Sequence, residues 1–342
     1  MMSSSSGNRQ IQQAMRPARA ALALGMATAL LLAPGPLPVS AVQSARCEIP
    51  VAETAAPITA AAQESAPTPV GAAIIQVEGQ AATPAPAASP SAPPPEPAAT
   101  LAQGLTAVSE ALAACLSEGD VETVVELAGE RYLGQIFGGS VPLPAEEYIA
   151  LASQLTPIPT RIVSVEEITP NGEDRATAVV SQVVGNQLMR AEWTFSQVAA
   201  SDRAEDESRW RLEGERQLDP RPPSGAAPLG VEIGDRSFEL SAESVAGPDI
   251  VLRGINVAAE DHEMLVLRLA PGYTTADLLR ATGPDLPQEV AFVGERPVPA
   301  GAQANLVLVD LEPGDYTLVC LFTNAEGLPH LAEGMAAEFT VG

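Results

Sequence analysis

The sequence predicts a multidomain chain in which an α+β domain is followed by an all-β sandwich. Three observations indicate this architecture. A Pro- and Ala-rich stretch sets the N-terminus apart. Apolar residues then recur at helical spacing and next in strict alternation. The last third consists of short alternating segments between Gly, Pro and Asp turns. A length of 342 residues is enough for two domains and a linker.

Composition excludes several classes of function. The formal net charge is −25, and all 18 basic residues are Arg. A chain this acidic is not expected to bind nucleic acid, because phosphate contacts require a concentrated positive surface. His262 and His330 are the two histidines of the whole sequence, so catalysis that uses several His residues is excluded as well.

Residues 1–41 are typical of an export signal, a signal peptide. Three Arg precede the apolar run 20–33, and Val39-Ser40-Ala41 places small residues where a signal peptidase cleaves. The run is shorter than the roughly 20 residues that a membrane span needs. We therefore expect an exported protein, extracellular or in the cell envelope. The alternative is an uncleaved signal that tethers the chain to the membrane.

Residues 42–100 are predicted to form a disordered Ala/Pro-rich linker. Pro is densest over 82–97, and such a composition cannot bury enough apolar surface to offset the entropy lost on folding. Proline-rich chain of this kind stays extended and semi-rigid. We expect it to hold the folded part away from a membrane or cell wall.

Residues 101–218 are predicted to form an α+β domain, because helical periodicity gives way to period-two alternation. Helices are expected at 105–116, 121–128 (with Asp120 as N-cap) and 144–155. Strands are expected at 161–169, 176–184, 188–198 and 208–218. Asn171-Gly172 and Gly185-Asn186 supply the turns that join the first three strands into an antiparallel meander.

This order of helices and strands, closed by the Trp-containing segment 210–214 (WRLEG), resembles the nuclear transport factor 2-like (SnoaL-like) cone fold. The resemblance implies a pocket in the cone and a homodimer through this domain. Enzymes of that family often use His and Asp, and this domain has no His, so their chemistry is not carried over. Tyr148, Glu192 and Trp193 either line such a pocket or are ordinary core and face-alternating residues, the interpretation we favour.

Cys115 falls on the apolar face of the first expected helix. Two alternatives are open for it. It is either a buried free thiol or the partner of Cys47 in a disulfide, which an oxidising compartment would allow. The residues of this domain indicate no reaction.

Residues 225–342 are predicted to form an all-β sandwich. Short strands are expected at 230–233, 237–240, 249–256, 264–269, 304–311, 314–321 and 336–341, with a short helix at 275–282.

Four residues of this domain form a metal-binding pattern. Cys320 ends an expected strand, nine residues separate it from His330, and four separate His330 from Met335. His262 is expected in a turn upstream. A thiolate, two imidazoles and a thioether suit copper in a trigonal site with a weak axial ligand. Zinc is a weaker alternative, because it does not need the thioether.

The residues around this pattern resemble the cupredoxin (type 1 blue copper) family over roughly the last third of the chain. Segment 313–320 (PGDYTLVC) is similar to the penultimate strand and ligand Cys of that family, and 330–335 (HLAEGM) has the plastocyanin-type spacing from second His to axial Met. The resemblance implies a Greek-key sandwich with one mononuclear copper. Its ligands would be His262, Cys320, His330 and Met335, and Asn256 would brace the ligand loop.

One departure restricts the expected activity. The loop from Cys320 to His330 is longer than in small plastocyanin- or azurin-type proteins and closer to the type 1 site of copper nitrite reductases. Those enzymes need a second, all-His copper, and no His remains to build it. We therefore expect an electron carrier that performs one-electron transfer and not an enzyme.

The expected partner is an unknown redox protein. Acidic residues outnumber basic ones in this domain, which favours a basic partner. Leu328, Pro329 and Leu331 flank His330 and form either a docking collar or ordinary loop packing. The competing interpretation of the chain is a metal-free cell-surface binding module with the same two folds.

Overall fold

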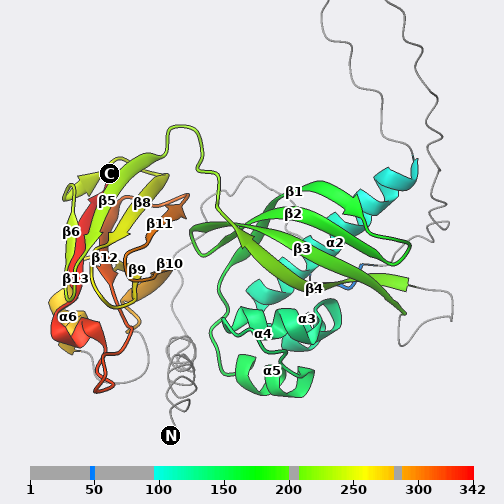
Figure 1. Cartoon of the computed structure of the whole chain (residues 1–342), viewed down its shortest axis with the longest axis horizontal. Coiled ribbons are helices and arrows are strands. Elements are labelled where there is room, and N and C mark those ends of the chain that lie inside the picture. Colours follow the sequence, from blue (N-terminus) through cyan, green and yellow to red (C-terminus); the bar gives the residue numbers. More distant parts are fainter. Residues whose placement is uncertain (1–46, 51–95, 200–207, 281–286) are drawn as a thin grey trace, which may run out of the picture.

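The computed structural model describes residues 47–50, 96–199, 208–280 and 287–342. Helices and a curved sheet form one part of the molecule, and a β-sandwich forms the other (Figure 1). The predicted export signal lies outside the described residues, as does most of the predicted linker.

Two parts of the predicted linker 42–100 belong to the first domain instead. Cys47 and Ile49 pack against the core of the first domain, and helix α2 (Glu96–Glu118) begins before residue 101. Pro97 made the start of this helix read as linker. It is the second residue of α2, in the first turn, where a missing N–H breaks no helical hydrogen bond.

The first domain has three further helices, α3 (Val121–Leu127), α4 (Glu130–Ile136) and α5 (Ala145–Ala152). The N-cap of α3 is Asp120, as predicted, and its Oδ1 accepts a hydrogen bond from the Thr123 N–H at 3.0 Å. The sequence pattern did not predict α4, because Gly134 reads as a helix breaker. A Cβ at Gly134 would lie 2.1 Å from the Val141 carbonyl oxygen, so this position requires glycine for close packing.

The helices are followed by the predicted meander of four antiparallel strands. They are β1 (Thr160–Pro170), β2 (Arg175–Val184), β3 (Gln187–Ala199) and β4 (Ser208–Leu218), and each pairs with the next. Gly172 and Gly185 take positive φ angles of 98° and 62° in the predicted turns.

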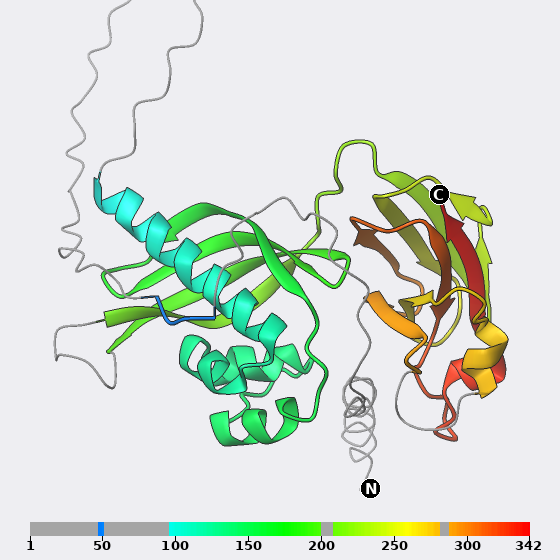
Figure 2. The same ribbon diagram turned by 180° about the vertical axis from the view of Figure 1, so that it is seen from behind.

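Helix α2 lies diagonally across one face of this sheet (Figure 2). By length and composition it could cross a membrane, but half of its apolar stretch is buried within the domain. Tyr148 and Trp193 are buried in the same core, whereas Glu192 pairs with Arg216 at 3.1 Å on the outer side. The favoured interpretation of these residues, as ordinary core and alternating-face positions, is confirmed.

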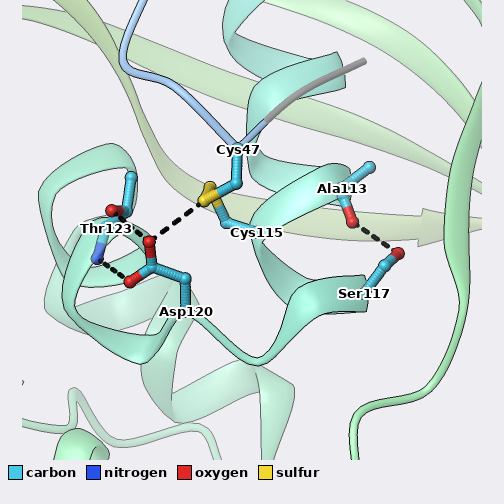
Figure 3. Close-up of a disulfide and its surroundings, with 6 residues drawn as sticks. All are labelled: Cys47, Ala113, Cys115, Ser117, Asp120 and Thr123. Atoms are coloured by element: carbon cyan, nitrogen blue, oxygen red, sulfur yellow. Dashed lines mark hydrogen bonds between the residues drawn. A yellow bond between two sulfur atoms is a disulfide. The ribbon is translucent and has the colours of Figure 1, made fainter. Parts of the chain in front are cut away.

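Cys47 and Cys115 form a disulfide (Figure 3). The alternative of a free buried thiol at Cys115 is therefore wrong. The bond fastens residues 47–50 to the fully buried face of α2, and the Cys47 Sγ lies 3.2 Å from the Asp120 carboxylate. Cys320 is then the one free cysteine of the chain.

The second domain is a sandwich of two sheets. Its strands are β5 (Ala227–Ile233), β6 (Phe238–Leu240), β7 (Ser244–Val245), β8 (Ile250–Asn256), β9 (His262–Leu269), β10 (Val290–Val298), β11 (Gln303–Leu308), β12 (Gly314–Val319) and β13 (Ala336–Val341). One sheet has the order β11-β8-β5-β6 and the other β10-β9-β12-β13-β7. Between them lies an apolar core, and α6 (Thr275–Arg280) covers a second apolar cluster beside β9.

Two strands of the sandwich, β7 and β10, were not predicted. Strand β7 has two residues, too few for an alternating pattern. In β10, Gly294 and Pro297 read as strand breakers. Gly294 lies at a register shift, and a Cβ there would meet the Leu308 side chain at 2.7 Å and the Gln187 Cβ at 3.0 Å, so a larger residue would displace these neighbours.

The two domains are joined by hydrogen bonds as well as by the chain. Strand β3 pairs with β11 at Gln187 and Leu308, so one sheet runs from the first domain into the second. The Gln187 amide also donates to the Glu295 carbonyl at 2.9 Å and accepts from the Glu295 N–H at 3.0 Å. Asn186 donates to the Val309 carbonyl at 2.9 Å. The junction is therefore a part of the sheet and not a hinge.

We predict that Cys47→Ser destabilises the first domain by about 2–4 kcal/mol, because the disulfide no longer restricts the unfolded chain. Urea unfolding followed by tryptophan fluorescence measures this domain alone, since Trp193 and Trp210 are the two tryptophans of the chain and both lie in its core. Dithiothreitol should lower the wild-type midpoint to the level of the variant and leave the variant unchanged. An unchanged midpoint in Cys47→Ser would contradict the prediction.

Candidate metal centre

The four predicted ligands come from one end of the sandwich. Cys320 directly follows β12, and His330 begins the short 3₁₀ helix η2 (His330–Glu333). Met335 lies between η2 and β13. His262 is the first residue of β9 and pairs with Val298 of β10. The prediction that it lies in the turn before this strand is therefore wrong.

Backbone hydrogen bonds close the loop from Cys320 to His330. The Leu331 N–H donates to the Cys320 carbonyl and the His330 N–H donates to the Phe322 carbonyl, both at 2.8 Å. Asn324 Oδ1 accepts from the N–H groups of Glu326 and Leu328 and so forms the turn at the loop tip. The extra length of this loop is thus folded back on itself, and both ligands remain at its base.

Three donor atoms converge at this base. The Cys320 Sγ lies 3.7 Å from His262 Nδ1 and 3.5 Å from His330 Nδ1, and the two Nδ1 atoms are 3.0 Å apart. Donors that each lie about 2.0–2.3 Å from one shared first-row metal ion show separations of this size. All three side chains are buried, with exposed fractions of 0–1%.

Met335 lies beside this group in the fold. Its side chain is fully buried in the same core cluster as Cys320, and its N–H donates to the His330 carbonyl at 3.0 Å. Gly334 before it has φ 93°, the left-handed conformation that ends η2 and turns the chain into β13.

Asn256 braces the chain on the other side of the group, before His262. Its buried amide donates to the carbonyls of Glu260 and Val298 at 2.9 and 2.8 Å, and its Oδ1 accepts from the Ala258 N–H at 2.9 Å. These bonds fix the 257–261 loop that leads to His262.

Burial sets the protonation of the ligands. It raises the pKa of the Cys320 thiol to about 12, against smaller lowering effects from the backbone N–H groups of Glu263 and Phe322. Burial lowers the pKa of His262, and the nearby His330 and Arg236 lower it further. Burial and Arg236 also lower the pKa of His330, while Glu260 and Glu333 oppose this shift. At neutral pH, without metal, the thiol is protonated and both imidazoles are neutral.

A thiol, two imidazole Nδ1 atoms and a thioether at the end of a two-sheet sandwich form the donor set typical of a type 1 copper site. The C-terminal domain that holds them is a two-sheet β-sandwich. Within the residues that the structure describes, the imidazole Nε2 atoms of His262 and His330 are buried and have no hydrogen-bond partner.

No protein-family model and no curated protein matches the chain. Among solved structures, it is similar to a dithionite-reduced auracyanin of Roseiflexus castenholzii (19% identity over 34% of this chain and 99% of that one, TM-score 0.24). Auracyanin B is similar at 18% identity, over 36% and 93% of the two chains, with a TM-score of 0.24. A Campylobacter jejuni multicopper oxidase is similar at 11% identity, over 53% and 48%, with a TM-score of 0.23. These TM-scores are low, so the function of this chain is argued from its own donor atoms.

Sequence reasoning missed three charged residues at this end of the sandwich. Arg236, Glu260 and Glu333 come from three separate loops and form ion pairs beside His330. Two leucines of the predicted apolar collar, Leu328 and Leu331, lie in different surroundings. Leu331 packs against the cluster under α6, whereas Leu328 is exposed at the loop tip. Loop packing therefore describes Leu331.

We predict that each copper ion bound at this site releases one proton between about pH 7 and 8. The raised pKa keeps the Cys320 thiol protonated throughout this range, and the metal needs the thiolate. Apparent affinity should therefore rise about tenfold per pH unit. Proton release on Cu(II) addition in weak buffer measures the stoichiometry, with Cys320→Ser as control. An affinity that does not change with pH would contradict this account.

Proposed function

We propose that this protein is an exported type 1 copper protein that carries single electrons. One observation supports the proposal above all others. The Cys320 thiol and the Nδ1 atoms of His262 and His330 meet within 3.0–3.7 Å in a fully buried place. Copper held there supplies a Cu(I)/Cu(II) couple.

Each ligand has a role in this proposal. Cys320 provides the thiolate, His262 and His330 the two equatorial nitrogens, and Met335 a weak axial thioether. Strand ends and short hydrogen-bonded loops hold these side chains, so they are fixed before any metal arrives. A rigid, dry ligand set allows electron exchange with little rearrangement.

The same ligand count supports an electron carrier and not an enzyme. Both histidines of the sequence belong to this one group, so an additional all-His copper of the kind that oxidases and nitrite reductases need has no ligands here. The redox partner would be a separate protein, and the acidic excess of the chain favours a basic one.

For the first domain we propose a SnoaL-like cone, supported by helices packed against one face of a curved four-strand meander. A homodimer through this domain belongs to the same proposal. Its aromatic core is filled by Tyr132, Trp193 and Phe195, and its sheet continues into the copper domain. We assign it a structural role, as a fixed base for the copper domain.

Export is supported by the Cys47–Cys115 disulfide, because such bonds persist in oxidising compartments. The predicted signal peptide and the predicted Ala/Pro-rich linker are consistent with the same location, at a distance from a membrane or wall.

We predict that Cu(II) added to the purified full chain produces an intense visible thiolate-to-copper charge-transfer band with one copper per chain. Cys320→Ser should abolish the band, because no other free thiol exists in the chain. Elemental analysis checks the stoichiometry and shows zinc in its place if zinc is preferred. A folded wild-type chain that gives no band and holds no copper would refute electron transfer and favour the metal-free binding module.

We further predict that Met335→Leu retains copper and the band but raises the reduction potential, because loss of a donor destabilises Cu(II) relative to Cu(I). Met264→Leu is the matched control. Met264 is a fully buried methionine of the same core, but its Sδ packs toward Gly254. Equal potentials in the two variants, or loss of all copper in Met335→Leu, would contradict the axial role.

A further inference from the structure

A charged side chain lies beside the imidazole edge of His330 at the surface of the sandwich. Its ring is 1% exposed, and its Nε2 has no hydrogen-bond partner. The Glu260 carboxylate lies 3.6 Å from this Nε2, within ion-pair range but longer than a hydrogen bond. The ligand is therefore buried while a half-exposed carboxylate stands directly over it.

Arg236 holds this carboxylate in place. Its Nη1 is 3.1 Å from Glu260 Oε2, and its Nε is 2.7 Å from Glu333 Oε2. Arg236 lies in the turn between β5 and β6, Glu260 in the loop before β9, and Glu333 in η2. One guanidinium thus connects two loops and η2 across the end of the domain, and η2 begins with His330 itself.

The backbone of Glu260 is fixed independently of this cluster. The buried Asn256 amide donates to the Glu260 carbonyl at 2.9 Å, so the residue starts from a defined position. The part that can adjust is its half-exposed side chain, within the limits set by its ion pair with Arg236. A rotation of that side chain would shorten the 3.6 Å distance between Glu260 Oε2 and His330 Nε2 to the roughly 2.8 Å of a charge-assisted hydrogen bond.

The chemistry of a ligating imidazole requires such an acceptor. When Nδ1 binds a metal, the proton of the neutral ring is on Nε2, and a carboxylate that accepts it fixes the tautomer and increases the donor strength of the ring. A negative charge there also stabilises Cu(II) more than Cu(I), because the oxidised ion carries the larger charge. Arg236, with the opposite charge, acts in the opposite direction.

We propose that Glu260 is a positioning residue for His330 and that Arg236 moderates it, so that this ion-pair cluster sets the reduction potential of the metal centre. The inference rests on the proposed copper function. It concerns Glu260, which lies beside the ligand His330, and the Arg236 that pairs with it, and not the metal itself.

The test measures potential and Cu(II) affinity in the full chain. Glu260→Gln keeps the size of the side chain and removes the charge, and it should raise the reduction potential and weaken Cu(II) binding about tenfold. This is the lower end of the usual effect of such partners, because the carboxylate is half-exposed and screened. Arg236→Gln should lower the potential. Exposed ion pairs contribute little to stability, so both variants should fold.

Glu312→Gln is the matched control, because it changes the net charge equally and breaks an ion pair with Arg268. Glu312 precedes β12, at the end opposite to Cys320. Opposite shifts in the Glu260 and Arg236 variants, with little shift in the control, support the proposal. Shifts of the same sign in both, or shifts no larger than the control, overturn it. Absence of copper from the wild type would instead refute the proposed function.

Discussion

The metal centre depends on the exclusion of water from three donor atoms that come from separate parts of the chain. Burial alone would not bring a thiol and two imidazoles within 3.7 Å, because each donor could make hydrogen bonds elsewhere. Backbone hydrogen bonds at the base of the 320–330 loop, and the Asn256 amide on the other side, fix the positions first. The apolar core between the sheets then keeps solvent away. The protonation of Cys320 and the neutrality of both imidazoles follow from the same burial.

The ligands could be predicted from the sequence because their chemistry is rare in it. Two His and three Cys leave few combinations, and the spacing from Cys320 through His330 to Met335 restricts them further. The meander of the first domain was also predictable, since alternation and Gly turns are local signals. Helix α4 and strand β10 were not, because Gly134 and Gly294 are present for close packing against distant backbone and side chains. A sequence pattern treats such glycines as breaks.

The charged cluster over His330 could not be predicted for a related reason. Arg236, Glu260 and Glu333 are separated by 24 and 73 positions along the chain, and each alone is an ordinary acidic or basic loop residue. Their proximity depends on the sandwich topology, which brings three loops to one end. The sequence left two alternatives for Cys115, a free thiol and a disulfide with Cys47, because a sequence shows which cysteines exist but not which ones the fold brings together.

The shared sheet affects how the protein can be divided. A fragment that starts after β4 would retain the four ligands but lose the partner of β11 at Leu308 and the side-chain bonds of Asn186 and Gln187. The backbone of Leu308 would then lie at an unpaired sheet edge, and unpaired edges template association between copies of a chain. The domain boundary that is clear in the sequence is therefore a poor place to truncate the protein. A fragment cut there would leave the backbone of Leu308 without the strand partner that it has in the intact chain.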